Sequence, residues 1–130
     1  MKGFVKDIEN LAVRNESFRK VLYTANDTQL VLMTLDPGQD IGPGTDDLDQ
    51  FFRVEEGTGE VTLDGVTTAV QPGFGVLIPA GVRHNLVNTG SHPLRLYSLL
   101  SPPNLRDGAV FATREAAEAD DHGFDGETTE

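Results

Sequence analysis

The chain has 130 residues and no cysteine, so it suits one domain around one hydrophobic core and excludes disulfides and thiolate zinc sites. Its 21 acidic and 10 basic residues give a formal net charge of -11, which argues against nucleic acid as a partner because phosphate groups would be repelled. No apolar run resembles a signal peptide or reaches the roughly 18 residues of a membrane span, so we expect a cytoplasmic protein without a membrane partner.

Short apolar segments separated by glycine and proline turns predict an all-β fold. In chain order, the expected strands cover residues 18–23, 29–35, 51–56, 60–63, 66–70, 76–78, 84–87 and 93–100. Many short strands with frequent turns are typical of a β-sandwich or a jelly roll. No internal repeat is visible in the sequence.

An Asp-Gly turn at residues 64–65 predicts a β-hairpin, because this dipeptide supplies the positive φ angles of a type I′ turn. A two-residue turn pairs Leu63 with Val66 and Val61 with Thr68. This register places the apolar side chains of both strands on one face.

Residues 73–88 combine a short apolar strand, a sharp reversal and one histidine. Pro79 and Gly81 force the chain to turn after the strand, and His84 opens the next one. Since side chains alternate along a strand, His84 and Leu86 face the same side. His84 is the best candidate in the chain for chemistry.

The last expected strand, at 93–100, is apolar on both faces, and the sequence leaves open which face lies inside. Tyr97 is expected either to line a pocket or to contact a second copy of the chain.

The C-terminal part predicts a short helix and an acidic tail. Thr113 can cap a helix of two turns, with Glu115 in its first turn, where the helix dipole favours an anion. Residues 115–130 hold seven acidic residues and no lysine or arginine. This composition predicts a solvated tail, and the alternative is a lid over the open end of the fold.

Five residues hold every fixed position of the second cupin motif: Gly73, Pro79, Gly81, His84 and Asn88. The chain therefore resembles the small single-domain bacterial cupins, which are RmlC-like jelly rolls. The resemblance implies an all-β barrel, the double-stranded β-helix, as a cupin domain over residues 1–112 with its core at about 28–105. The short helix and the acidic tail would occupy 113–130.

The first cupin motif is represented by residues 50–57, which match its second half. Its two histidines would fall at Gly44 and Asp46 with a three-residue spacer, or at Pro43 and Thr45 with a four-residue spacer. Neither register holds a histidine.

The resemblance implies a reduced metal site, because a typical cupin binds its ion with three histidines and one glutamate. The remaining candidate ligands are His84, Gln50 and Asp46, and an amide is a weak neutral donor. We expect no cofactor, or one weakly bound divalent ion of iron, manganese, nickel or zinc.

The expected pocket is mostly apolar with two polar groups. If His84 points into the barrel, the alternation and the family pattern also turn the residues around positions 50 and 86 inward. The expected substrate-binding residues are Gln50, Phe52, Val54, Leu86 and Tyr97. Such a pocket suits a small organic ligand with one or two hydrogen-bonding groups.

Three functions stay open. We favour a small-molecule enzyme in which His84 transfers a proton or holds the ligand, as in a lyase, isomerase or cyclase, because imidazole exchanges protons near neutral pH. The alternatives are a metal-dependent cupin oxygenase or isomerase, and a non-catalytic barrel that binds a small ligand. In a barrel without chemistry, His84 would be a buried neutral imidazole bonded to Gln50.

A homodimer is expected as well. Small cupins generally pair, and an open jelly roll leaves sheet edges and apolar outer residues such as Phe51 that a second copy would cover.

Overall fold

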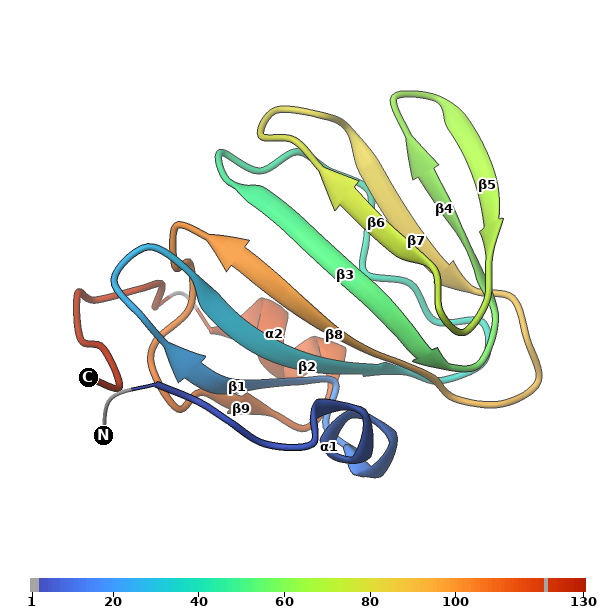
Figure 1. The fold of residues 1–130 in the computed structure, drawn as a ribbon. Helices are drawn as coiled ribbons and strands as arrows, with labels where there is room; N and C mark the ends of the chain where they lie inside the picture. The colour runs from blue at the N-terminus through green and yellow to red at the C-terminus, as the bar shows by residue number, and fades with distance from the viewer. Residues whose placement is uncertain (1–2, 121) are drawn as a thin grey trace.

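Two antiparallel β-sheets face each other and form a jelly-roll barrel, which confirms the predicted fold class (Figure 1). The computed structural model describes residues 3–120 and 122–130. In chain order the strands are β1 (Arg19–Thr24), β2 (Gln29–Leu35), β3 (Asp49–Glu56), β4 (Gly59–Leu63), β5 (Val66–Val70), β6 (Gly75–Ile78), β7 (His84–Asn88), β8 (Leu94–Ser101) and β9 (Val110–Phe111). The larger sheet has the order β6-β3-β8-β2-β1-β9, and the smaller sheet has the order β5-β4-β7.

The eight predicted strands are all present, with ends shifted by at most two residues. Helix α2 (Arg114–Ala119) also forms as predicted, and the Thr113 side chain caps it by accepting a hydrogen bond from the Ala116 amide at 3.1 Å. Strand β9 and helix α1 (Ile8–Arg14) were not predicted. Neither helix, within the described ranges, is long and apolar enough to cross a membrane.

The β4–β5 hairpin has the predicted register. Leu63 pairs with Val66 across a turn whose two residues have φ values of 48° and 84°, as a type I′ turn requires. Val61 and Val70 are buried, whereas Val66 is 68% exposed. The predicted apolar face is therefore only partly covered, because β5 is the edge strand of the smaller sheet.

Strand β8 shows which of its two apolar faces lies inside. Leu94 and Leu96 are buried and pack between the two sheets. Ser98 shares their face, while Arg95 and Tyr97 belong to the opposite, outer face of the larger sheet.

The chain between β2 and β3 runs along the free edge of β7. The Ile41 amide donates to the Leu86 carbonyl at 3.1 Å, and Gly44 exchanges two backbone hydrogen bonds with His84, of 3.1 and 2.9 Å. These bonds cover the edge of the smaller sheet. They also hold the residues that follow Gly44 beside the strand that carries His84.

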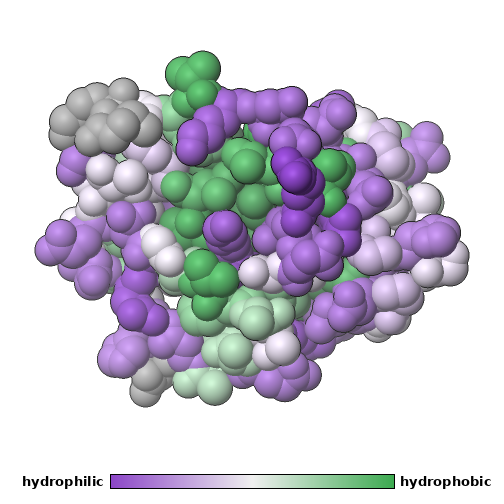
Figure 2. Space-filling view, turned by 90° about the horizontal axis from the view of Figure 1, so that it is seen from below, coloured by the Kyte–Doolittle hydropathy of each residue, from purple (hydrophilic) through white to green (hydrophobic). Residues whose placement is uncertain are grey.

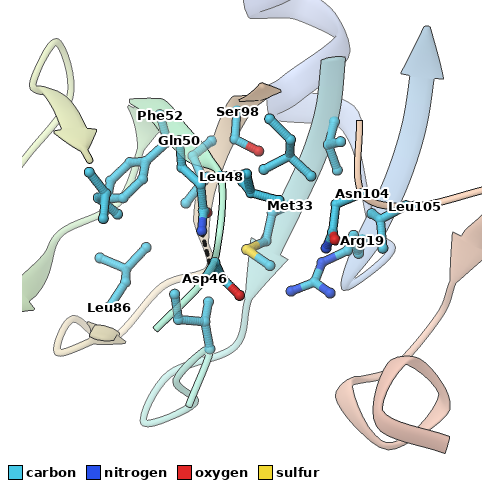
Figure 3. Close-up of a pocket in the computed structure, with 15 residues that line it drawn as sticks. Arg19, Met33, Asp46, Leu48, Gln50, Phe52, Leu86, Ser98, Asn104 and Leu105 are labelled. Carbon is cyan, nitrogen blue, oxygen red and sulfur yellow. Dashed lines mark hydrogen bonds between the residues drawn. The ribbon is translucent and has the colours of Figure 1, made fainter. Parts of the chain in front are cut away.

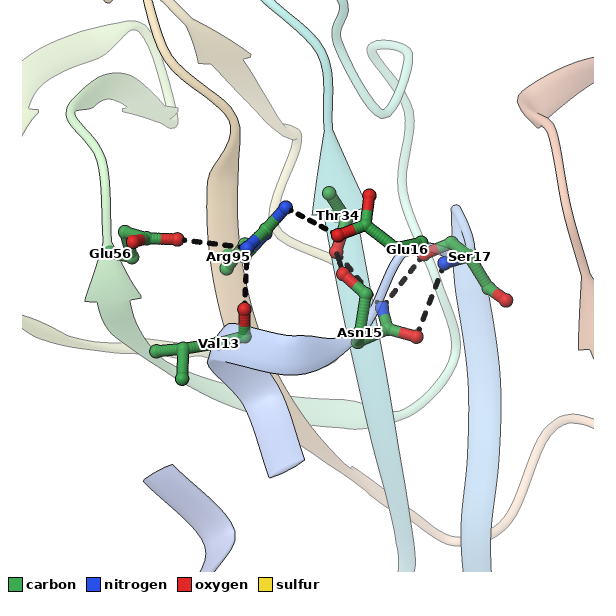
Figure 4. A network of polar contacts seen from close by, with 7 residues as sticks. All are labelled: Val13, Asn15, Glu16, Ser17, Thr34, Glu56 and Arg95. Carbon is green, nitrogen blue, oxygen red and sulfur yellow. Dashed lines mark hydrogen bonds and ion pairs between the residues drawn. The ribbon is translucent and has the colours of Figure 1, made fainter. Parts of the chain in front are cut away.

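Helix α1 packs on the outer face of the larger sheet through Ala12, which is fully buried. Arg95 fastens the end of this helix by donating to the Val13 carbonyl at 2.5 Å (Figure 4). The same guanidinium forms ion pairs with Glu16 at 2.8 Å and Glu56 at 3.2 Å. A cation at the C-terminal end of a helix also interacts favourably with the helix dipole.

The outer face of the larger sheet carries a row of apolar side chains. Phe51 pairs with Leu77 on one side and with Leu99 on the other, and Leu99 pairs with Leu30. We call these four residues the outer row. Hydrophobic side chains also gather, inside a hydrophilic border, on the lower side of the molecule, where β1, β2 and β9 lie in Figure 1 (Figure 2).

The acidic tail returns to the barrel instead of extending into solvent. Within residues 122–130, the Phe124 amide donates to the Asn104 carbonyl at 3.1 Å, and the Thr129 amide donates to the Thr24 carbonyl at 2.9 Å. The tail therefore lies against the loop after β8 and the end of β1. Most tail residues within 122–130 remain exposed, while backbone hydrogen bonds hold the tail to the barrel.

Candidate functional site

A cavity of about 120 Å³ lies inside the barrel, where the segment before β3 meets the loop after β8. Most of the residues that line it are apolar, and Met33, Phe52 and Leu86 lie around it (Figure 3). The polar residues that line it are Arg19, Asp46, Gln50, Ser98 and Asn104. Sites for small molecules are usually hydrophobic cavities that contain a few polar groups.

The carboxylate of Asp46 connects the polar side chains at the mouth of the cavity. Gln50 donates a hydrogen bond from Nε2 to Asp46 Oδ2 at 2.5 Å. The Nε2 atom of His84 lies 3.5 Å from the same oxygen. Gln50 therefore bonds to Asp46 and not to His84, which differs from the sequence-based expectation.

The second nitrogen of His84 fixes the tautomer of the ring. His84 Nδ1 lies 2.9 Å from the carbonyl oxygen of Val82, and a carbonyl can only accept, so Nδ1 carries a hydrogen. In a neutral ring, Nε2 would then present a lone pair to the Asp46 carboxylate. Nε2 and Oδ2 are thus placed to exchange a proton with each other.

Arg19 is a site residue that the sequence analysis missed. It lies on β1 and its guanidinium lines the cavity, yet none of the described residues forms a hydrogen bond or ion pair with it. The guanidinium lies over the Phe18 ring in a cation–π contact, with the ring centroid 5.2 Å from Arg19 Cζ. Burial lowers the pKa of Arg19 from its usual value, and the negative charge of Asp46 opposes this shift.

The loop after β8 closes one end of the cavity and is held by the buried side chain of Gln29. Gln29 Oε1 accepts hydrogen bonds from the amides of Asn104 and Leu105 at 3.2 and 3.0 Å. Its Nε2 donates to the Leu105 carbonyl at 2.8 Å and to Thr24 Oγ1 at 2.9 Å. The sequence did not predict that this loop packs on Gln29, because the hydrogen bonds join residues more than 70 positions apart.

The structure brings together most of the predicted site residues. Gln50, Phe52, Leu86 and Asp46 line the cavity, and His84 lies in the adjoining recess, which it shares with Arg19, Asp46 and Gln50. Two predicted residues lie elsewhere: Val54 and Tyr97. Val54 is fully buried in the core beyond the cavity. Tyr97 corrects the prediction of a pocket residue, because it stands on the outer face of β8.

The donors at the mouth do not fit a cupin-type metal ion. A mononuclear site needs three or four strong donors in a fixed geometry. His84 and Asp46 supply two, and the N–H side of the Gln50 amide faces Asp46, since its oxygen would be repelled by the carboxylate. No group of three or more histidine, cysteine, aspartate or glutamate residues suited to a metal ion occurs in the ranges 3–120 and 122–130.

Comparisons with known proteins agree with this fold. The family profile described as "Cupin domain" matches residues 31–100. Uncharacterized protein YrkC of Bacillus subtilis is 38% identical over 125 residues, which are 91% of this chain and 67% of that protein. The crystal structure of BH2720 from Bacillus halodurans has a TM-score of 0.90 and 40% identity, and covers 92% of this chain and 96% of its own.

An RmlC-like cupin from Shewanella frigidimarina has a TM-score of 0.60 and 25% identity, over 65% of this chain and 74% of that one. The profile match, the relatives and the jelly-roll barrel agree, and the chain belongs to the cupin family.

Proposed function

We propose that this protein is a small-molecule enzyme of the cupin type that transfers a proton inside the barrel through His84 and Asp46. The observation that carries the proposal is the geometry of the ring: Nδ1 lies 2.9 Å from the Val82 carbonyl oxygen, which can only accept a hydrogen bond, and Nε2 lies 3.5 Å from Asp46 Oδ2. A proton held by this pair is available to a group bound in the cavity, because Asp46 lines both the cavity and the recess of His84.

The neighbouring groups support this role by fixing the carboxylate. Gln50 occupies one side of Asp46 Oδ2, so the carboxylate keeps one orientation toward the ligand. The segment that carries Asp46 is in turn bonded to β7 through Gly44 and His84. Proton transfer next to an apolar wall suits an isomerase, a lyase or a cyclase, and none of these needs an ion at the weak donor set of this barrel.

A non-catalytic barrel that binds a small ligand is the second candidate. His84 is only 5% exposed, and it reaches the main cavity through Asp46 rather than directly. In this function the pair would orient the ligand and no bond would change.

Exchange of carbon-bound hydrogen in D₂O tests the proposal. Small hydroxy and keto acids are incubated with the protein, and NMR follows deuterium at the carbon next to the carbonyl or hydroxyl group. We expect exchange that falls about a hundredfold or more in Asp46→Asn and in His84→Asn, since general acid–base catalysis contributes that much. The control Asp47→Asn changes an exposed neighbour and should keep the wild-type rate.

The outcomes separate the candidates. Exchange that survives a chelator and disappears in both variants supports the proposal. Exchange that disappears with the chelator and returns with iron, manganese, nickel or zinc supports a metal-dependent enzyme instead. Ligands that bind without any exchange support the non-catalytic barrel.

We also propose that two copies of the chain pair through the outer row. Leu77 in this row is 64% exposed, and Phe51 and Leu99 continue the apolar surface across β3 and β8. A sheet face of this kind can meet its own copy around a two-fold axis, which is the commonest symmetry of homo-oligomers.

A further inference from the structure

We infer that the cavity takes a small organic acid whose carboxylate binds the Arg19 guanidinium and whose hydroxyl group faces Asp46. The inference rests on the proposed function for the place of the site, and it adds the chemical class of the ligand. Three observations carry it: an arginine side chain that forms no hydrogen bond or ion pair with the described residues, a carboxylate at a second position in the same cavity, and apolar side chains between them.

Arg19 stands apart from the other partly buried arginines. Arg53, Arg95 and Arg114 each form an ion pair with at least one carboxylate. The Arg19 side chain forms no hydrogen bond or ion pair in the described part of the chain, although its guanidinium lines the cavity inside the barrel. Burying a cation away from water raises the free energy of the folded protein unless an anion pairs with it. A ligand carboxylate bound in the cavity would offset this desolvation penalty.

The guanidinium is built to recognise a carboxylate. Its planar array of N–H groups matches the two oxygens of a carboxylate and forms two parallel, charge-assisted hydrogen bonds. Burial lowers the pKa of Arg19, and the group remains a cation at neutral pH because a guanidinium ordinarily loses its proton only in strongly alkaline solution. The Asn104 amide lies at the same end of the cavity and can add a donor (Figure 3).

Asp46 restricts the ligand at its other end. The carboxylate of Asp46 repels a second anion, so the acid group of the ligand belongs at the Arg19 end. Asp46 instead accepts a hydrogen bond, which a hydroxyl group of the ligand supplies. Met33 and Leu96 line the cavity and would contact the apolar part of the ligand.

The size of the cavity limits the ligand to a few carbon atoms. Its volume of about 120 Å³ lies well below the roughly 300–1,000 Å³ of sites for drug-sized molecules. A short branched hydroxy acid combines the required charge, hydroxyl group and apolar body.

The methyl group of Met33 is a direct reporter for this test, because the chain has only two methionines and Met33 lines the cavity. The probes are lactate, 2-hydroxybutanoate and 2-hydroxy-3-methylbutanoate, each beside its primary amide, and ¹³C-methyl NMR follows the Met33 signal. Met33→Leu assigns the signal. We expect the acids to shift it and the amides to bind about tenfold to a hundredfold more weakly, as expected for loss of a charge-assisted pair.

Arg19→Gln should weaken binding of the acids by a similar factor and leave the amides unchanged. Arg19→Lys keeps the charge and loses the planar array, so it should give intermediate affinity and guards against a folding defect in the first variant. Lys20→Gln is the matched control, because it removes one positive charge from the next residue of β1, which is exposed.

Equal affinities for the acids and the amides would overturn the inference. So would acids that leave the Met33 signal unmoved, or acids that bind Arg19→Gln as tightly as the wild type.

The ligand class and the proposed proton transfer can be refuted independently of each other. If the acids bind through Arg19 but exchange no hydrogen in D₂O, the ligand class stands and the catalytic role of His84 and Asp46 is lost. If the neutral amides exchange hydrogen and the acids do not bind, the reverse holds.

Discussion

Replacement of Gln29 by leucine should destabilise the protein strongly, although the two side chains have similar volumes. The Gln29 side chain is fully buried and makes four hydrogen bonds, three of them to the backbone of the loop after β8. Leucine leaves the amides of Asn104 and Leu105 and one carbonyl without these partners. A buried polar group that loses its partner costs about 1–3 kcal/mol, and partial access of the loop to water favours the lower end.

We therefore expect Gln29→Leu to lower the free energy of unfolding by about 3–5 kcal/mol, a large part of the roughly 5–15 kcal/mol of a typical domain. Urea unfolding followed by circular dichroism measures this loss. Gln39→Leu is the matched control, because the Gln39 side chain accepts one hydrogen bond, from the Asp36 amide in an exposed turn, and the loss of that bond should cost less than about 1 kcal/mol. Equal losses in the two variants would refute the reasoning that the buried amide holds the loop.

Two further predictions concern the end of the chain and the outer row. The hydrogen bond from the Tyr23 hydroxyl to Glu130 raises the pKa of Tyr23 above its usual value of 10.0, so its contribution to stability is complete below pH 10 and is lost as the pH rises through the raised value. In the Tyr97→Phe background, absorbance titration should place the ionisation of Tyr23 above pH 10 and show it lowered by Glu130→Gln; an unchanged titration contradicts this. Leu99→Lys should turn the proposed dimer into a monomer in light scattering, whereas Thr67→Lys on exposed β5 should not. If both variants are monomers, or both are dimers, the outer row is not the contact.

The sequence could predict the strands and the hairpin because their determinants are local. The alternation of side chains, the Asp-Gly turn and the Pro-Gly reversal before His84 each act over a few residues. The inner face of β8 could not be predicted, since leucines occupy both faces and only the packing of the two sheets decides between them. Helix α1 also escaped prediction, because it is seven residues long and depends on its contacts with the larger sheet.

The candidate site was predicted in part. His84, Gln50 and Phe52 lie around the cavity or its mouth, as the spacing of the motif indicated. The contact between His84 and Asp46 depends on the path of the segment along β7, which no local pattern reveals. Arg19 was missed because a β-bulge further along β1 obscures the alternation of side chains in that strand.

The segment that carries Ile41 and Gly44 along β7 has a consequence for the solution behaviour of the protein. An uncovered β7 would offer a row of free amides and carbonyls to which a strand of another molecule could add. Here the chain's own backbone occupies those groups. The same stretch that brings Asp46 to His84 thus also protects the barrel from growing into fibrous aggregates at that edge.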